Sequence, residues 1–303
     1  MKPIRIHEVG PRDGLQAEQS VVPTEVKLDW IRRAAGSGVD IVQVGSFVRS
    51  DKLPQMADTD ELFRILGKES HRAVLSGLVL NEKGLERALA VGVQLICLGV
   101  SASETHSRKN TGMGTEDATR HIIAAALEAQ KAGRQVQVSV QSAFGCGFEG
   151  PISEDRVMGI VTAYFEAGLR SISLADTAGH AHPAQVRRYV QQVLALDPAA
   201  DITAHFHDTY SLGMANIYAA MEAGARSIET SFGGLGGCPF TKVAAGNVAT
   251  EDLVHGLQRN GQRLDVDLAA LIGVAKDVAS HFGRELPGCV YKTGPIQAAG
   301  RIQ

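Results

Sequence analysis

The chain has 303 residues, of which 44% are hydrophobic and 21% charged, and this composition is typical of a globular enzyme with a large core. Thirty Lys and Arg residues nearly balance thirty-three Asp and Glu residues, and the formal net charge of -3 excludes the basic surface expected of a protein that binds nucleic acid or an anionic membrane. The sequence shows neither an N-terminal signal segment nor 18 uninterrupted apolar residues, so we expect a cytoplasmic protein without a membrane-spanning segment.

Short β-branched runs alternate with longer amphipathic stretches along the whole chain, which is the pattern of βα units around a parallel sheet. The predicted strands span 4–9, 40–45, 72–78, 94–100, 135–140, 171–176, 201–207 and 227–232. The predicted helices span 24–36, 59–68, 82–91, 115–132, 154–167, 184–196 and 211–223. Eight units without a domain break favour a closed (β/α)₈ TIM barrel over the main alternative, a doubly wound open sheet.

The C-terminal part of the chain follows the eighth unit and is predicted to be an addition to the barrel. A helix is predicted over 266–285, followed by an irregular end rich in Gly and Pro. We therefore expect a single domain over 1–303, with the barrel over about 1–260 and a C-terminal helical segment over about 261–303.

The sequence AHFHD (204–208) ends the seventh predicted strand and carries two histidines two positions apart. Their imidazoles project from one face of the strand, so His205 and His207 are suited to share a metal ion; the alternative is a polar pair in the core. Asp13 follows the first strand, and in a barrel the strand ends meet at one mouth. Because buried imidazoles need partners, this third group favours the metal. Mixed nitrogen and oxygen donors without a nearby thiolate indicate Mg²⁺ or Mn²⁺.

Two further residues have candidate catalytic roles. Arg12 lies beside Asp13 at the mouth of the first strand, where its guanidinium is suited to stabilise an enolate or carboxylate oxygen; a surface ion pair is the alternative. The stretch GGLGGCPF (233–240) is a glycine-rich loop that carries Cys238. A cysteine on a loop that closes can act as a general acid or base, and a small apolar side chain packed under the loop is the alternative.

Six sequence blocks in order resemble the 3-hydroxy-3-methylglutaryl-CoA lyase family, a lyase branch of the metal-dependent barrel enzymes. The resemblance covers nearly the whole chain. The blocks are EVGPRDGLQ (8–16), SFV with PQM (46–48, 54–56), SLADT (173–177), HFHDTY (205–210), GGLGGCPF (233–240) and GNVATEDLV (246–254).

The resemblance implies a role for each matching residue. Arg12 is implied to stabilise the enolate and Cys238 to take part in proton transfer. The implied metal ligands are Asp13, His205, His207 and Asn247. The residues implied to line the acyl pocket are Ser46, Ser173 and Asp176.

This sequence departs from the family pattern around the same pocket. The second strand reads IVQVGSFV where the family has a pattern like IEVTSFV, so Gln43 replaces a glutamate. An amide accepts hydrogen bonds but carries no charge, so the pocket is more positive by about one elementary charge than a pocket with glutamate at this position. Ala175 replaces a glycine, and the segments after the fifth and eighth strands also differ.

The leading functional hypothesis is a metal-dependent retro-Claisen lyase that acts on a 3-hydroxyacyl-CoA. For the family's parent substrate, the products implied are acetyl-CoA and acetoacetate, in leucine degradation. The departures at Gln43 and nearby favour as an alternative a lyase or aldolase for a citramalyl-CoA-like or longer branched substrate. A metal-retaining protein without catalytic activity is the alternative from another class. The expected partner is a small acyl-CoA molecule, and the sequence is compatible with a homodimer. The loop residues that are candidates for contacts with CoA are Lys52, Lys109 and Asn110.

Overall fold

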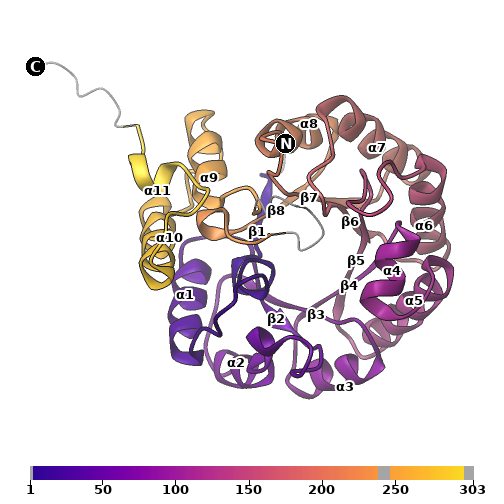
Figure 1. Cartoon of the computed structure of the whole chain (residues 1–303), viewed down its shortest axis with the longest axis horizontal. Coiled ribbons are helices and arrows are strands. Elements are labelled where there is room, and N and C mark those ends of the chain that lie inside the picture. The colour runs from indigo at the N-terminus through magenta and orange to yellow at the C-terminus, as the bar shows by residue number, and fades with distance from the viewer. Residues whose placement is uncertain (1–2, 238–245, 297–303) are drawn as a thin grey trace, which may run out of the picture.

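The computed structural model describes residues 3–237 and 246–296, and in it eight parallel strands close into a barrel in chain order (Figure 1). The strands are β1 (Arg5–Glu8), β2 (Ile41–Ser46), β3 (Val74–Leu78), β4 (Leu95–Ser101), β5 (Gln135–Gln141), β6 (Ser171–Asp176), β7 (Asp201–Phe206) and β8 (Ser227–Thr230). All eight coincide with predicted strands to within a few residues. The predicted TIM barrel is therefore confirmed.

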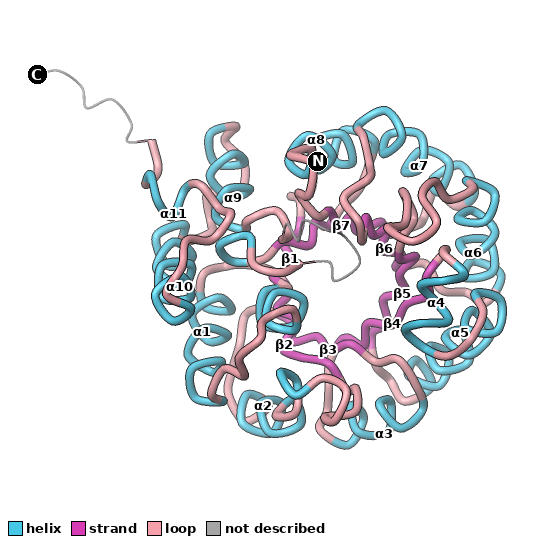
Figure 2. Tube along the Cα trace, viewed as in Figure 1, coloured by secondary structure: helices cyan, strands magenta, loops and turns pink. Residues whose placement is uncertain are grey.

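Helices surround the barrel as an outer ring, which the tube view shows clearly (Figure 2). They are α1 (Thr24–Gly36), α2 (Thr59–Leu66), α3 (Glu82–Ala90), α4 (Glu104–Thr111), α5 (Thr115–Lys131), α6 (Glu154–Glu166), α7 (Pro183–Leu196), α8 (Gly213–Ala223) and α9 (Thr250–Arg259). Pro183 is at the first turn of α7, where its missing N–H costs no helical hydrogen bond. No helix among the described residues is long and apolar enough to cross a membrane.

The main hydrophobic core lies between the outer face of the barrel and the helices, as expected for strands that are buried on both faces. A smaller apolar cluster within the barrel is formed by Ile41, Leu95 and Cys97, with Val74 and Leu78 packed against it. Because strand residues alternate between the two faces, these positions identify the inward-facing residues of β2, β3 and β4.

A β-bulge in β2 changes which residues face the interior. Gln43 pairs with Ser76 on β3, but the next pair is Gly45 with Gly77, so Val44 is one extra residue. Ser46 then pairs with Leu78, which packs against the interior cluster. The bulge therefore turns both Gln43 and Ser46 inward, although three positions separate them in sequence.

The C-terminal segment adds α10 (Leu268–Phe282) and α11 (Val290–Thr293) beside α1 and α9 (Figure 1). Before α10, the buried side chain of Arg263 reaches the N-terminal end of the barrel. It donates from Nη1 to Ile4 O at 2.8 Å and to Asp40 Oδ2 at 2.6 Å, and from Nη2 to Gly38 O at 2.8 Å. These bonds tie the predicted helical addition to the first two strands.

Candidate active site

The chain leaves β1 in a single turn of π-helix, η1 (Gly10–Gly14), which carries Arg12 and Asp13. The backbone N–H groups of Arg12 and Asp13 both donate to Val9 O, at 3.0 and 2.7 Å. The predicted first strand, 4–9, is therefore one residue too long at its C-terminal end. This tight turn places the two functional side chains at the C-terminal mouth of the barrel, where enzymes of this fold have their active sites.

Three donor atoms converge at this mouth, from η1 and from the end of β7. Asp13 Oδ2 lies 3.4 Å from His207 Nε2 and 4.0 Å from His205 Nε2. One ligand atom from each residue fits within a group no more than 4.8 Å across, and all three residues are buried. Donors around a six-coordinate cation with bonds of about 2.1 Å are about 3 Å apart when adjacent and about 4 Å apart when opposite. The three groups are thus spaced to share one divalent ion.

Asn247 joins this group from the segment after β8, where it pairs with His207 in an isolated β-bridge. Its Nδ2 donates to Asp13 Oδ2 at 2.9 Å and to Leu235 O at 3.1 Å. Its buried Oδ1 has no hydrogen-bond partner among the residues that the structure describes. Gly236 adopts φ +126° against this amide, and an added Cβ would lie 2.7 Å from Nδ2. The amide thus presents Nδ2 to Asp13, and a half-turn of the amide would bring the orphaned Oδ1 to the same place, where it could coordinate a cation.

The carboxyl group of Asp13 is held as an anion. Burial alone would raise its pKa, but the charge of Arg12 and the two imidazoles outweigh burial and keep the pKa well below the usual value. Arg12 donates from Nη1 to Asp13 and from Nε to Gln43, and Gln16 Nε2 donates to Asp13 Oδ1 at 3.0 Å. The amide of Gln43 thus lies directly against Arg12.

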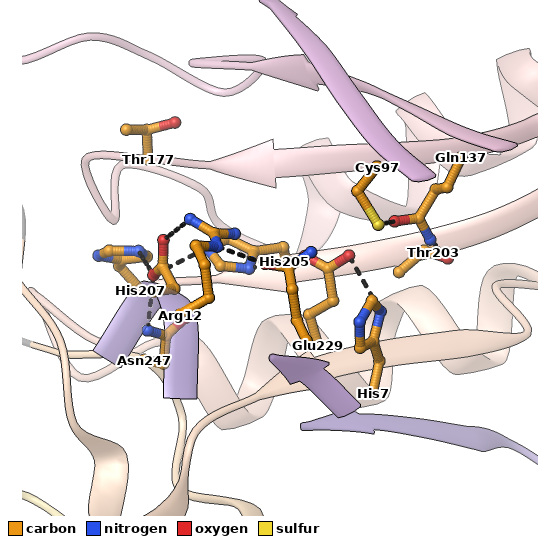
Figure 3. A network of polar contacts seen from close by, with 12 residues as sticks. His7, Arg12, Cys97, Gln137, Thr177, Thr203, His205, His207, Glu229 and Asn247 are labelled. Carbon is orange, nitrogen blue, oxygen red and sulfur yellow. Dashed lines mark hydrogen bonds and ion pairs between the residues drawn. The ribbon is translucent and has the colours of Figure 1, made fainter. Parts of the chain in front are cut away.

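A second carboxylate, Glu229 on β8, lies behind the donor group and was not predicted. Its Oε2 is 2.9 Å from His205 Nδ1, and its Oε1 is 3.5 Å from His7 Nδ1 (Figure 3). Burial alone would raise the pKa of Glu229, but the interaction with His205 and the neighbouring charges outweigh burial and lower this pKa. Burial lowers the pKa of His7 to about 4, so the imidazole of His7 is neutral. The alternation in SIETSF was the available signal, because it places residue 229 inward on a strand beside β1 and β7.

The three residues predicted to line the acyl pocket differ in their surroundings. Ser46 is inward-facing, and so is Ser173, which pairs with the interior residue Thr203; neither hydroxyl has a hydrogen-bond partner among the described residues. Asp176 instead accepts hydrogen bonds from the backbone N–H groups of His180 at 2.8 Å and Ala181 at 3.0 Å. Burial raises its pKa. The two serines are thus the better placed to meet a ligand.

A cavity of about 530 Å³ opens beside η1. Its walls come from residues 17–20, 235–237, and Phe282, Arg284 and Pro287. Lys52, Lys109 and Asn110 are not among the residues that line it, and their role in CoA binding stays a prediction. The loop that forms one wall leads to Cys238, which lies outside the described residues.

The chain matches the model of the HMGL-like family over residues 3–278. It is 37% identical to a hydroxymethylglutaryl-CoA lyase of Bacillus subtilis, covering 94% of this chain and 95% of that protein, and 36% identical to an (R)-citramalyl-CoA lyase of Chloroflexus aurantiacus, covering 98% and 96%. It also resembles the structure of an HMG-CoA lyase from Acinetobacter baumannii in complex with coenzyme A and 3-methylmalate, with a TM-score of 0.91, 38% identity and coverage of 99% and 98%. The chain therefore belongs to the HMGL-like family of carbon–carbon lyases.

Proposed function

We propose that this protein is a divalent-metal-dependent lyase that cleaves 3-hydroxy-3-methylglutaryl-CoA, or a close relative, into acetyl-CoA and a keto acid such as acetoacetate. The observation that carries the proposal is the convergence of Asp13, His205 and His207, with the amide of Asn247 in contact with Asp13. These four side chains would hold the ion, which we propose to be Mg²⁺ or Mn²⁺ because oxygen donors and imidazoles are combined without a thiolate. When bound, such an ion polarises oxygens of the substrate and lowers the pKa of its hydroxyl group.

The residues around the ion site match the needs of a retro-Claisen reaction. The substrate hydroxyl gives its proton to a base, the bond between its carbon and the acetyl methylene breaks, and the electron pair moves into the enolate of acetyl-CoA, which takes up one proton on carbon. Two nitrogens of Arg12 are engaged, with Gln43 and Asp13, and they hold the guanidinium rigidly beside the donor group. In this orientation Arg12 stabilises the enolate oxygen, because a fixed cation needs no rearrangement as charge develops.

The other proposed contacts concern substrate binding and the final proton. Ser46 and Ser173 present buried hydroxyl groups without partners among the described residues, and a polar acyl group would satisfy them. The cavity between residues 17–20 and 235–237 is near the donor group and is large enough for part of a CoA chain. Cys238 or a water is proposed to donate one proton to the enolate carbon, which offsets the proton that the hydroxyl gave to the base.

The direct test is coupled detection of acetyl-CoA from 3-hydroxy-3-methylglutaryl-CoA after chelation and reconstitution with Mg²⁺ or Mn²⁺. We expect activity that depends on added metal, and we expect Asp13→Ala and His205→Ala each to abolish it, because each removes a donor from the ion site. Wild-type turnover by either variant would show that the site is wrongly placed. Turnover by the wild type that ignores chelation would exclude the metal.

A citramalyl-CoA-like substrate is the second candidate, favoured by Gln43. The two relatives named as lyases for the two substrates are 37% and 36% identical to this chain, so overall identity does not choose between them. The Acinetobacter enzyme was crystallised with 3-methylmalate in addition to coenzyme A. Both acyl groups carry one carboxylate, which is attached to the hydroxyl-bearing carbon in citramalyl-CoA and lies one methylene farther away in 3-hydroxy-3-methylglutaryl-CoA. A neutral side chain on Arg12 leaves more positive charge for a carboxylate held close to it than a glutamate would.

A substrate panel with the wild type and Gln43→Glu separates the two candidates. If Gln43 selects the substrate, the wild type turns over citramalyl-CoA faster than 3-hydroxy-3-methylglutaryl-CoA, and Gln43→Glu reverses this preference. An unchanged ratio of kcat/KM values in the two proteins would exclude residue 43 as the determinant.

We further propose that residues 1–303 form one lyase domain. A cytoplasmic location, a homodimer and a role in leucine degradation stay predictions.

A further inference from the structure

Glu229 occupies the middle of a row of inward-facing residues across three neighbouring strands. It pairs with His7 on β1 and with His205 on β7, in the register of the barrel. Partners in a parallel sheet point to the same face, so a carboxylate lies between two imidazoles inside the barrel. Figure 3 shows this arrangement, with His205 between Glu229 and the side of the site that holds His207.

Each carboxylate oxygen of Glu229 has its own imidazole. Oε2 is 2.9 Å from His205 Nδ1, whereas Oε1 is 3.5 Å from His7 Nδ1. Both contacts have ion-pair distances without the alignment of a hydrogen bond, and neither nitrogen has another partner among the described residues. The opposite nitrogen of His205, Nε2, lies 4.0 Å from Asp13 Oδ2 in the proposed ion site. An imidazole that donates from Nδ1 must present the lone pair of Nε2 when it is neutral, which is the form that binds a cation.

The far side of the row is also fixed. His7 Nε2 is 3.0 Å from Ser76 Oγ, and Ser76 Oγ is 3.4 Å from the carbonyl oxygen of Val42. His7, Ser76 and Glu229 are all buried, so none of these contacts is shared with bulk water. A buried carboxylate is costly unless it is paired, and this chain of contacts restricts Glu229 to one orientation.

We propose that Glu229, supported by His7, is a positioning residue that holds His205 with its Nδ1 protonated and its Nε2 directed at the metal ion. The inference rests on the proposed metal site and adds to it a group on β8 that contacts no ligand of the ion except His205. It also accounts for the charge of the pocket: a carboxylate is absent at Gln43 on β2, while Glu229 supplies one from β8. Loss of such a supporting carboxylate typically weakens metal binding by about 10- to 100-fold.

The test measures Mn²⁺ affinity by electron paramagnetic resonance, without any substrate. Glu229→Gln keeps an acceptor for His205 Nδ1 but removes the charge, and we expect Mn²⁺ binding to weaken by about 10- to 100-fold. Glu229→Asp keeps the charge on a shorter side chain and should recover part of that loss. Asp40→Asn is the control, because Asp40 is a half-buried acidic residue that pairs with the buried Arg263 at the N-terminal end of the barrel, opposite the donor group. Its Mn²⁺ affinity should stay close to that of the wild type.

A second readout reports on the imidazole itself. In protein labelled with ¹⁵N-histidine, the Nδ1 proton of His205, identified by its loss in His205→Gln, should resonate far downfield because it is shared with a carboxylate. Glu229→Gln should move this resonance upfield, whereas Asp40→Asn should not. A purely structural role of Glu229 would leave the resonance in place and affect only the thermal stability.

The outcomes separate this inference from the proposed function. If the wild type binds Mn²⁺ and Asp13→Ala does not, while Glu229→Gln binds as tightly as the wild type, the metal site stands and the role of Glu229 is refuted. If Asp40→Asn weakens binding as much as Glu229→Gln, loss of any paired carboxylate in the barrel explains the effect and the positioning role is again refuted. If the wild type binds no Mn²⁺ that depends on Asp13, both fail.

Discussion

Arg12 makes two contacts at once that only a planar fork can maintain. Its Nε donates to Gln43 and its Nη1 to Asp13, so the guanidinium is fixed by β2 and by its own turn. Lysine carries the same charge on a single ammonium group, and that group cannot reproduce both directions. The side chain therefore contributes geometry in addition to charge.

Arg12→Lys should lower kcat by about 100- to 1000-fold, the range found when a fixed donor to a developing oxyanion is lost. The effect on KM should be much smaller, because the charge that attracts the substrate remains. Steady-state kinetics with saturating Mn²⁺ measures both constants. A kcat close to that of the wild type would mean that charge alone suffices and that the fork plays no part in the reaction.

The donor residues were predictable from sequence because their spacing and strand order carry geometric information. A pair of histidines at positions i and i+2 shares a strand face, and strand ends of a barrel meet at one mouth, so His205, His207 and Asp13 had to converge. Glu229 was not predictable in the same way. A single glutamate in a strand acquires meaning only when the register places it opposite His7 and His205. Similarly, the inward direction of Ser46 depends on a bulge that leaves no clear trace in the sequence.

At the scale of elements, the π-helical turn η1 shapes the site. Its first residue, Gly10, is enclosed: an added Cβ would lie 2.7 Å from Glu8 Oε1 and 2.8 Å from the ring of Phe232. The backbone N–H of Gly10 donates to the same Glu8 oxygen at 2.7 Å, which also accepts from Phe232 N at 3.0 Å. Glu8 thus links the turn after β1 to the turn after β8.

Gly10→Ala should lower the free energy of unfolding by about 1 to 3 kcal/mol, as overpacking does in a dense core. Activity should fall further than stability accounts for, since a shift of η1 moves Arg12 and Asp13. Gly159→Ala in α6 is the control, because nothing lies within 4 Å of its added Cβ, and it should stabilise the protein by about 0.5 to 1 kcal/mol. Urea unfolding and the lyase assay test both variants, and full activity in Gly10→Ala would contradict a fixed turn.

Some elements could not be found by hydrophobic periodicity. Helix α4 has the sequence ETHSRKNT and buries only His106 and Ser107, so it offers no apolar stripe. It begins where Ser103 Oγ accepts a hydrogen bond from His106 N at 3.1 Å, which is a capping interaction. The additional helix after the barrel was predicted over 266–285 and extends over Leu268–Phe282, because its apolar spacing is regular.

At the scale of the whole molecule, two buried carboxyl groups make stability depend on pH. Burial raises the pKa of Glu8 to about 7 and that of Glu251 to about 8, from an ordinary value of 4.5. The folded protein therefore holds these protons over a range where the unfolded chain has released them. The contribution of these two groups to stability is greatest at the acidic end of that range and is lost as the pH rises toward 8.

Glu251→Gln removes one of these protonation sites, and its amide oxygen can still accept the hydrogen bond from Gly233 N, which measures 3.0 Å in the wild type. We expect the fall in unfolding free energy between pH 5 and pH 8 to be smaller in this variant by about 2 to 4 kcal/mol. Urea unfolding at several pH values checks the slope. Glu61→Gln, at an exposed position on α2, should keep the wild-type slope; an identical slope in Glu251→Gln would show that Glu251 does not titrate in this range.

Closure of the sheet has a consequence for how copies of this chain associate. Each of the eight strands is hydrogen-bonded to a neighbour on both sides, since β1 pairs with β8. The barrel therefore presents no open row of backbone N–H and C=O groups onto which a foreign strand could add. Any dimer must form through side chains of helices or loops. At high protein concentration, the closed barrel also prevents the strand-by-strand addition from which fibrils grow.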